Sequence, residues 1–227
     1  MLSLNEVLRK YAEQGSDALE SAVDEIVQLG YLAEYLHDLL EGPKSSYASQ
    51  FPVGYRHPNG FTKIRLAELS DYGWAIRLHV WAEQSADDNI HSHRWKFASR
   101  ILSGSLIEET YDITAEAGEY AKYYCAPSVQ GRYSLSFQHN CDVRPVGRDL
   151  YQPGASYARD AKTLHMAFAD STSRVVTLFV QGSEQATFTT VIRGPRSDVN
   201  SNVVAPRCSK AELKELLQEV AGLIARG

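Results

Sequence analysis

The spacing of apolar residues predicts helices at the N-terminal end of the chain. Between residues 3 and 42, apolar side chains recur three or four positions apart, which is typical of a helix with one buried face. Ser3 and Glu6 match the capping box that begins many helices. Gly15-Ser16-Asp17 interrupts the pattern, and Gly30 is a second candidate break. We therefore expect consecutive helices rather than one long helix.

In the middle of the chain the period of the pattern changes to two. Glu41-Gly42-Pro43 predicts the end of the helices, and residues 43–59 are expected to form a loop. From residue 60 to about residue 193, short runs alternate between apolar and polar positions, as β-strands do. The strand-like runs are 61–66, 74–81, 88–97, 99–102, 106–113, 120–125, 133–137, 163–168, 174–180 and 186–192. Many short strands separated by turn-forming residues favour a sandwich or a barrel.

A loop and a last helix are expected after the strands. Gly194-Pro195-Arg196 opens a loop over residues 194–208, and a second capping box, Ser209 with Glu212, begins the helix. We predict three regions, which are an N-terminal helical extension packed on the barrel (1–59), a β-barrel (60–193), and a loop with a C-terminal helix (194–227). A dimer contact is the alternative role for the helical ends.

Composition and charge narrow the class of protein. The formal net charge is −5, so the chain has no basic footprint for nucleic acid. No apolar run reaches the roughly 20 residues that cross a bilayer, and the N-terminal residues do not resemble a secretory signal. The three cysteines, Cys125, Cys141 and Cys208, are widely spaced and suggest free thiols. We expect a cytoplasmic protein with neither a nucleic-acid nor a membrane partner.

Three histidines form the most informative polar pattern. His91 and His93 lie two positions apart in the run 88–97, so on a regular strand both imidazoles share one face. His165 lies in a distant run, 163–168. A strand-borne pair and a distant third histidine can bind one metal ion inside a barrel. The alternative is a set of histidines that are satisfied within the core.

The first histidine pair lies in a segment that resembles the first motif of the cupin superfamily. That motif runs Gly, five residues, His-x-His, three or four residues, Glu, six residues, Gly. This chain keeps His91, His93 and Gly104 at the corresponding spacing. Ser85 stands at the first glycine, and Phe97 or Ala98 stands at the glutamate.

The third histidine lies in a segment similar to the second cupin motif. Gly154 and His165 are in register with that motif, whereas Asp160, Lys162 and Ala169 replace its Pro, Gly and Asn. The resemblance covers residues 60–193. It implies a mainly β fold, a cupin (jelly-roll) β-barrel flanked by N-terminal helices and a C-terminal helix. It also implies that His91, His93 and His165 bind a metal in the barrel mouth.

The missing glutamate changes the expected chemistry. Three neutral imidazoles leave a divalent ion its full charge, which favours anionic partners. The chain is similar to three-histidine cupins, notably thiol dioxygenases of the cysteine dioxygenase kind, and this implies Fe(II). Zn, Ni and Mn are alternatives, because imidazole binds many metals, and no organic cofactor motif is present. Glu109 or His79 is the candidate for a fourth ligand.

Other residues are candidates for binding and catalysis. Arg77, on the run 74–81, is expected to bind a substrate carboxylate if it faces inward, as the resemblance to thiol dioxygenases implies. His79 and Tyr157 are candidate proton carriers, and Trp95 and Phe97 are expected to dry the pocket and contact substrate. For each of these residues, packing or surface exposure is the alternative.

Three functions compete at this point. The first is an Fe(II) oxygenase, a dioxygenase that combines O₂ with a small polar, carboxylate-bearing metabolite. The second is a non-oxidative metal-dependent isomerase or lyase. The third is a non-catalytic small-molecule-binding cupin. A homodimer is compatible with each of them.

Overall fold

The computed structural model describes residues 2–42, 51–87, 89–127, 132–170, 174–194 and 201–225. The helices are α1 (Leu4–Ala12), the 3-10 helix η1 (Ser16–Ala18), α2 (Leu19–Gln28), α3 (Tyr31–Glu41) and α4 (Lys210–Ile224). The strands are β1 (Val53–Arg56), β2 (Phe61–Leu69), β3 (Trp74–Trp81), β4 (Ile90–His91), β5 (Trp95–Ser103), β6 (Leu106–Cys125), β7 (Arg132–Tyr151), β8 (Ser156–Arg159), β9 (Leu164–Ala169), β10 (Val175–Glu184), β11 (Thr189–Arg193) and β12 (Ser201–Val204).

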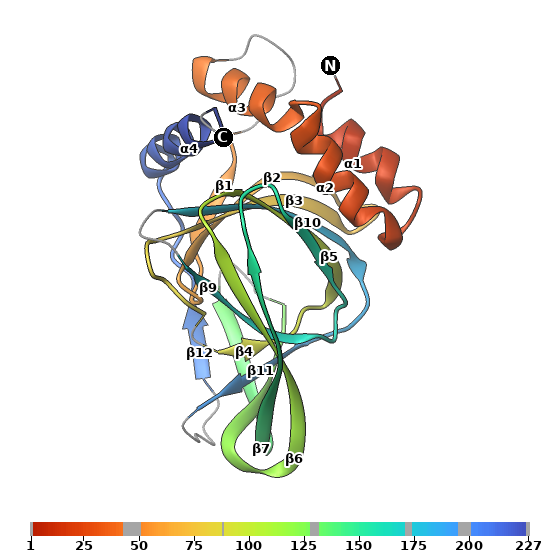
Figure 1. The fold of residues 1–227 in the computed structure, drawn as a ribbon, viewed down its shortest axis with the longest axis vertical. Helices are drawn as coiled ribbons and strands as arrows, with labels where there is room; N and C mark the ends of the chain where they lie inside the picture. Colours follow the sequence, from red (N-terminus) through yellow and green to blue (C-terminus); the bar gives the residue numbers. More distant parts are fainter. Residues whose placement is uncertain are drawn as a thin grey trace.

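Two antiparallel six-stranded sheets form a barrel, with the helices outside it (Figure 1). The first sheet has the order β1-β2-β3-β10-β5-β8, and the second has the order β11-β4-β9-β6-β7-β12 with a further β11–β6 pairing. Strands far apart in the sequence are therefore neighbours, as in a jelly roll. The predicted fold class, a mainly β cupin-like jelly roll with helices at both ends, is confirmed.

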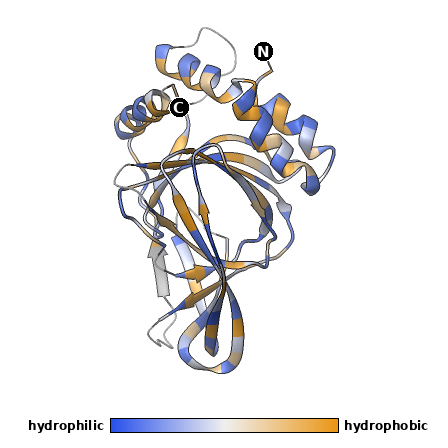
Figure 2. Ribbon diagram, in the orientation of Figure 1, coloured by the Kyte–Doolittle hydropathy of each residue, from blue (hydrophilic) through white to orange (hydrophobic). Residues whose placement is uncertain are grey.

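The first sheet is buried on both of its faces. Ile76, Leu78 and Val80 of β3 belong to the same hydrophobic cluster as the inner faces of the helices, which include Leu8 and Leu217. The helices carry hydrophobic residues on one side and hydrophilic residues on the other, as amphipathic helices do (Figure 2). The alternate residues of β3 therefore point into the barrel.

The helical ends form much as their sequences predict. The capping boxes at Ser3 and Ser209 are both complete, since each serine side chain accepts a backbone N–H and the glutamate three residues later accepts the serine N–H. Gly15 and Gly30 separate the N-terminal helices, each with a positive φ. In the described ranges of the chain, no helix is long and apolar enough to cross a membrane.

The run 88–97, predicted as one strand, is two strands in different sheets. β4 ends at His91 and β5 begins at Trp95, so the chain crosses from one sheet to the other between them. The crossing is fixed by polar contacts. The Ser92 hydroxyl accepts from the Thr190 N–H at 2.9 Å, and the His93 N–H donates to the Ala161 carbonyl at 2.9 Å.

The edges of the sheets also differ from prediction. β1 and β12 lie in segments predicted as loops, because a four-residue edge strand is too short to produce a clear alternation. The runs 106–113 and 120–125 belong to one strand, β6, which pairs along its length with β7 and passes an irregularity between Ala115 and Tyr120. The predicted helix stop at Pro43 and the loop start at Pro195-Arg196 lie outside the described residues.

Two glycines of the cupin-like motifs allow a test of local strain. Gly104 and Gly154 both have positive φ, 70° and 88°. A methyl group on Gly104 would lie 2.8 Å from Val175 Cγ2 and 3.0 Å from the Arg174 carbonyl oxygen, whereas on Gly154 the nearest atom would be Arg100 Nη2 at 4.0 Å. We expect Gly104→Ala to lower the free energy of unfolding by about 2–4 kcal/mol and Gly154→Ala by about 1–2 kcal/mol, since only the first adds a clash to the backbone cost.

Chemical denaturation of the two variants side by side measures this difference. Equal losses would show that the contact with Val175 and Arg174 costs nothing, and would contradict the packing described for this turn.

Candidate metal centre

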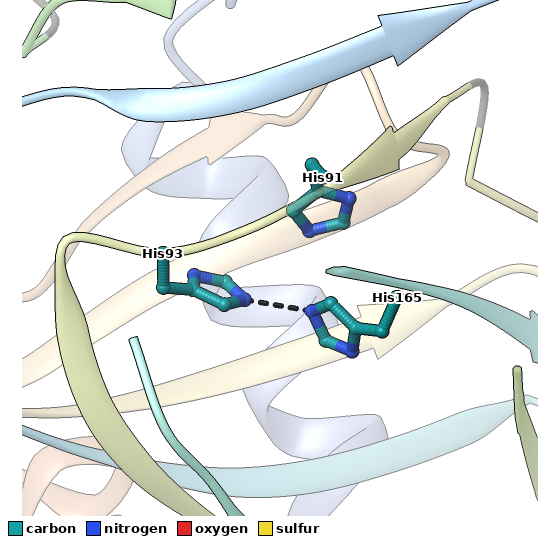
Figure 3. Close-up of side chains that lie close together, drawn as sticks. All are labelled: His91, His93 and His165. Atoms are coloured by element: carbon teal, nitrogen blue, oxygen red, sulfur yellow. Dashed lines mark hydrogen bonds between the residues drawn. The ribbon is translucent and has the colours of Figure 1, made fainter. Parts of the chain in front are cut away.

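Three histidines converge on one point inside the barrel (Figure 3). His91 on β4 and His165 on β9 are direct cross-strand partners, so their side chains leave the sheet side by side. His93 follows two residues later and turns back toward them. The ring centroids lie 4.8–5.1 Å apart, and the Nε2 atoms of His93 and His165 are 2.9 Å apart. The structure thus brings together the three histidines that the sequence singled out.

The segment before β4 holds His91 in place. The Asp87 N–H donates to the Ala167 carbonyl at 2.9 Å, and the Asp87 carboxylate accepts from the Ala167 N–H at 2.7 Å, which attaches this segment to β9. The His91 Nδ1 lies 3.3 Å from the Asn89 carbonyl oxygen. A carbonyl only accepts, whereas the Asn59 amide nitrogen, 3.4 Å from the same Nδ1, donates, so the two contacts favour opposite tautomers of the His91 ring.

A buried carboxylate orients His165. The Glu108 side chain on β6 accepts from His165 Nδ1 at 2.6 Å, and its other oxygen accepts from Arg159 Nη2 at 2.5 Å. Glu108 is only 1% exposed. This contact fixes the tautomer of His165 and directs the lone pair of its Nε2 toward His93. Carboxylates and carbonyls behind the ligating histidines are a regular feature of protein metal sites.

Burial keeps His91 and His93 neutral. It lowers the pKa of His91 to about 3 and that of His93 well below its ordinary value, and in both cases the neighbouring His165 adds to the effect. Neutral imidazole is the form that binds metals. Two ring nitrogens 2.9 Å apart are also close to the separation of adjacent ligands around an ion bound at about 2.1 Å. The residues therefore fit a divalent transition metal, with one ring nitrogen from each histidine within 4.8 Å of the others.

The carboxylates near the site have separate roles. Phe97, which stands at the motif's glutamate position, is buried and packs against His93 and Phe179 with ring centroids 4.8 and 4.6 Å apart. Glu109, the proposed substitute ligand, pairs instead with Arg148 and accepts from the Tyr111 hydroxyl. Glu108 is the residue that sequence reasoning missed. The alternation of β6 contains the signal, because Glu108 shares the inward face with Leu106 whereas Glu109 does not.

A pocket of about 220 Å³ opens beside the histidines. Arg77, His79 and Trp95 line it, as expected for inward-facing residues, whereas His79 is not part of the three-histidine group. His57 also lines the pocket and stacks on Phe61, with their ring centroids 4.6 Å apart.

Two candidate residues lie behind the pocket rather than on its wall. Phe97 is 1% exposed and forms the floor beneath His93. Tyr157 lies further back, where it stacks on Tyr151 at 4.3 Å and meets Phe97 edge-on at 6.1 Å. Burial raises the pKa of the Tyr157 hydroxyl far above its ordinary value. Tyr157 therefore packs beneath the site, and the catalytic role predicted for it stays a prediction.

Comparisons with known proteins return structural neighbours only. No protein-family model matches the chain, and no curated protein matches it. The solved structures similar to it include the Drosophila melanogaster CENP-C cupin domain (TM-score 0.40, 9% identity, 68% of this chain and 98% of that chain). Another is a cupin superfamily protein from Desulfitobacterium hafniense (0.32, 13%, 56% and 82%). A third is a hydroquinone 1,2-dioxygenase in complex with Cd²⁺ and 4-hydroxybenzonitrile (0.35, 13%, 53% and 63%).

The class of protein rests on the molecule's own topology and site. Two antiparallel six-stranded sheets form its barrel, and its three-histidine group lies inside that barrel with a carboxylate behind it. It is a jelly-roll β-barrel with a candidate metal centre.

Neighbouring glutamates allow a test of the role of Glu108. We expect Glu108→Gln to weaken metal binding by about 10–100-fold, because the neutral amide no longer supports the His165 imidazole. Glu109→Gln removes the same charge from the other face of β6 and is expected to change affinity less than about threefold. Competition titration with Co²⁺ or Zn²⁺ against a chromophoric chelator measures both variants. Equal weakening would show that the effect is general and does not pass through His165.

Proposed function

We propose that the protein is a metal-dependent enzyme, an Fe(II) oxygenase that acts on a small polar, carboxylate-bearing metabolite. The observation that carries this proposal is a group of three histidines, without a carboxylate among them, beside a pocket with a cationic wall. Such a set leaves a divalent ion its full positive charge and open coordination positions. Iron(II), when bound, would supply a position at which substrate and O₂ meet.

Arg77 is the residue proposed to hold the substrate carboxylate. It lies on the inner face of β3, and its guanidinium lies 5.2 Å from the ring centroid of Trp95. Among the described residues, no acid lies within ion-pair distance of Arg77, so its donors are available to a ligand. A guanidinium binds a carboxylate through two parallel hydrogen bonds, which fixes the orientation of the substrate.

His79 is proposed to move a proton in the same pocket. Its ring lies between Phe61 and Phe179, at centroid distances of 4.5 and 4.7 Å. Its Nε2 is buried, and no hydrogen-bond partner for it lies in the part of the chain that the structure describes. Burial lowers the pKa of His79 well below its ordinary value, so the ring is neutral and a nitrogen lone pair is free to accept a hydrogen bond from an acidic proton of the substrate.

Oxygen consumption tests the proposal. Iron-loaded protein is expected to take up O₂ when supplied with a substrate from a panel of thiols, amino acids and small phenols. His91→Ala is expected to lose both the metal and the uptake while keeping the fold, whereas His37→Ala, an exposed histidine on α3, keeps both.

The alternatives predict other outcomes. Stoichiometric zinc in protein purified without added metal, with no O₂ uptake, would favour an isomerase or lyase that uses the ion as a Lewis acid. Full biological activity in His91→Ala would favour a non-catalytic binding protein.

Arg77 has its own kinetic signature. With any acid that supports turnover, Arg77→Met is expected to raise KM by about 10–100-fold, since the charged hydrogen bonds to the carboxylate are lost. The value of kcat should change much less, because the carboxylate contact is the same in the ground and transition states. Arg144→Met, on an exposed position of β7, provides the matched control. An unchanged KM for Arg77→Met would exclude it as the carboxylate-binding residue.

A further inference from the structure

The pocket beside the histidines is cationic although the chain as a whole is acidic. Its wall contains Lys63, Arg77, Arg94 and Arg193. No aspartate or glutamate belongs to its lining among the described residues. The formal net charge of the chain is −5, so this concentration of positive charge is local and does not follow from composition.

Lys63 is the least expected of these cations. It lies on β2, directly opposite His79 of β3, and its Nζ donates to the Tyr133 hydroxyl at 3.3 Å. No carboxylate of the described chain forms an ion pair with it. Burial lowers its pKa to about 7, and the nearby Arg77 and Arg94 add to this effect. An ammonium group in this position is costly unless an anion accompanies it.

Arg77 and Arg94 line the same pocket. Their guanidinium groups lie 5.2 and 4.9 Å from the ring centroid of Trp95. Arg94 is already paired with Glu184 at 3.0 Å, whereas Arg77 has no such partner among the described residues. The Trp95 Nε1 is buried, and no acceptor for it lies in the described part of the chain. Within the described ranges of the chain, the wall therefore combines two cations that form no ion pair with an acid and a buried N–H donor that has no acceptor.

We propose that Lys63 and Arg77 together bind a dianionic group, so that the substrate of the proposed function is a small phosphorylated or dicarboxylic acid. A single carboxylate would balance only one of the two cations and leave the other buried without a counter-charge. A phosphoryl monoester, or two closely spaced carboxylates, balances both. Arginine and lysine are also the residues that most often bind such groups. The inference rests on the proposed function where it names the substrate, but its test requires no enzymatic activity.

Binding of simple anions to metal-free protein tests the inference independently of any activity. The protein is stripped with a chelator, and sulfate, inorganic phosphate, malonate and acetate are titrated calorimetrically at pH 6.5 and constant ionic strength. We expect sulfate, and either phosphate or malonate, to bind at least about tenfold more tightly than acetate. Once each affinity is corrected for the fraction of the acid that is dianionic at pH 6.5, a preference for phosphate over malonate would indicate a phosphoryl substrate, and the reverse preference a dicarboxylic one.

Lysine variants locate the binding. Lys63→Met is expected to weaken sulfate binding by about tenfold or more. Lys162→Met makes the same change of side chain and charge at an exposed turn and should leave affinity within about twofold. The melting temperature of Lys63→Met in the absence of anions should be unchanged or higher, because a buried cation without an acid partner is removed. Lys63→Arg, which keeps the charge, should retain most of the affinity.

The pH dependence adds a second readout. Sulfate keeps its charge between pH 6 and pH 9, so weaker binding above pH 7 reports the loss of a proton from the protein. Lys63 faces His57, His79, Arg77, Arg94 and Tyr133. Burial holds the pKa of both histidines well below 6.5, so neither gains or loses a proton in this range. The decline should therefore occur in the unaltered protein and be absent in Lys63→Arg.

Two results would overturn the inference. Acetate binding as tightly as sulfate, phosphate and malonate would show that a single negative charge suffices. Equal behaviour of Lys63→Met and Lys162→Met would show that the anions bind elsewhere. Because the protein carries no metal in these measurements, either result leaves the oxygenase proposal untouched, and failure of O₂ uptake leaves the dianion inference untouched.

Discussion

The pairing of β4 with β9 is the constraint on which the site depends. It consists of a single register pair, His91 with His165, between segments that the sequence places far apart. Two backbone and side-chain contacts between Asp87 and Ala167 hold the same junction. Because the two imidazoles leave adjacent positions of one sheet, their separation is set by the strand spacing rather than by long flexible side chains. His93 needs only the turn that follows β4 to complete the group.

A second constraint is the cover that the helices place over the first sheet. With Ile76 and Leu78 buried against the helices, β3 gains its hydrophobic stabilisation on the outer face. Its inner face is therefore released from the usual requirement for apolar residues, and Arg77 and His79 line the pocket there. The helical ends lie remote from the histidines, yet their packing is what allows a polar interior. This arrangement also explains why hydrophobic patterning alone could not decide which face of β3 was inside.

Sequence patterns predicted the features that follow from short-range periodicity. The capping boxes, the helix breaks and the three histidines are examples, because each depends on spacing within a few residues or on a motif. The break between His91 and Trp95 was not predictable, since it depends on a change of sheet. His57 was missed for a related reason: its burial comes from strands that lie elsewhere in the sequence. The role of Glu108 could have been predicted from the sequence, but only after it was known which residues of β6 face inward.

The histidine group and the cations of the pocket both favour a negatively charged ligand. Three neutral imidazoles would add no negative charge to a divalent ion, and the carboxylate behind them, Glu108, is already balanced by Arg159. Lys63 and Arg77 line the same pocket as His91 and His93 and add positive charge to it. In a poorly solvated pocket such charges interact more strongly than they would in water. An anionic ligand thus balances the charge of an ion at the histidines and the charges of Lys63 and Arg77 at once. A neutral or cationic molecule of the same shape leaves these buried charges unbalanced. The pocket therefore discriminates between ligands by charge before it discriminates by shape. Any ligand without negative charge leaves Lys63 and Arg77 buried without a counter-charge, which lowers its affinity.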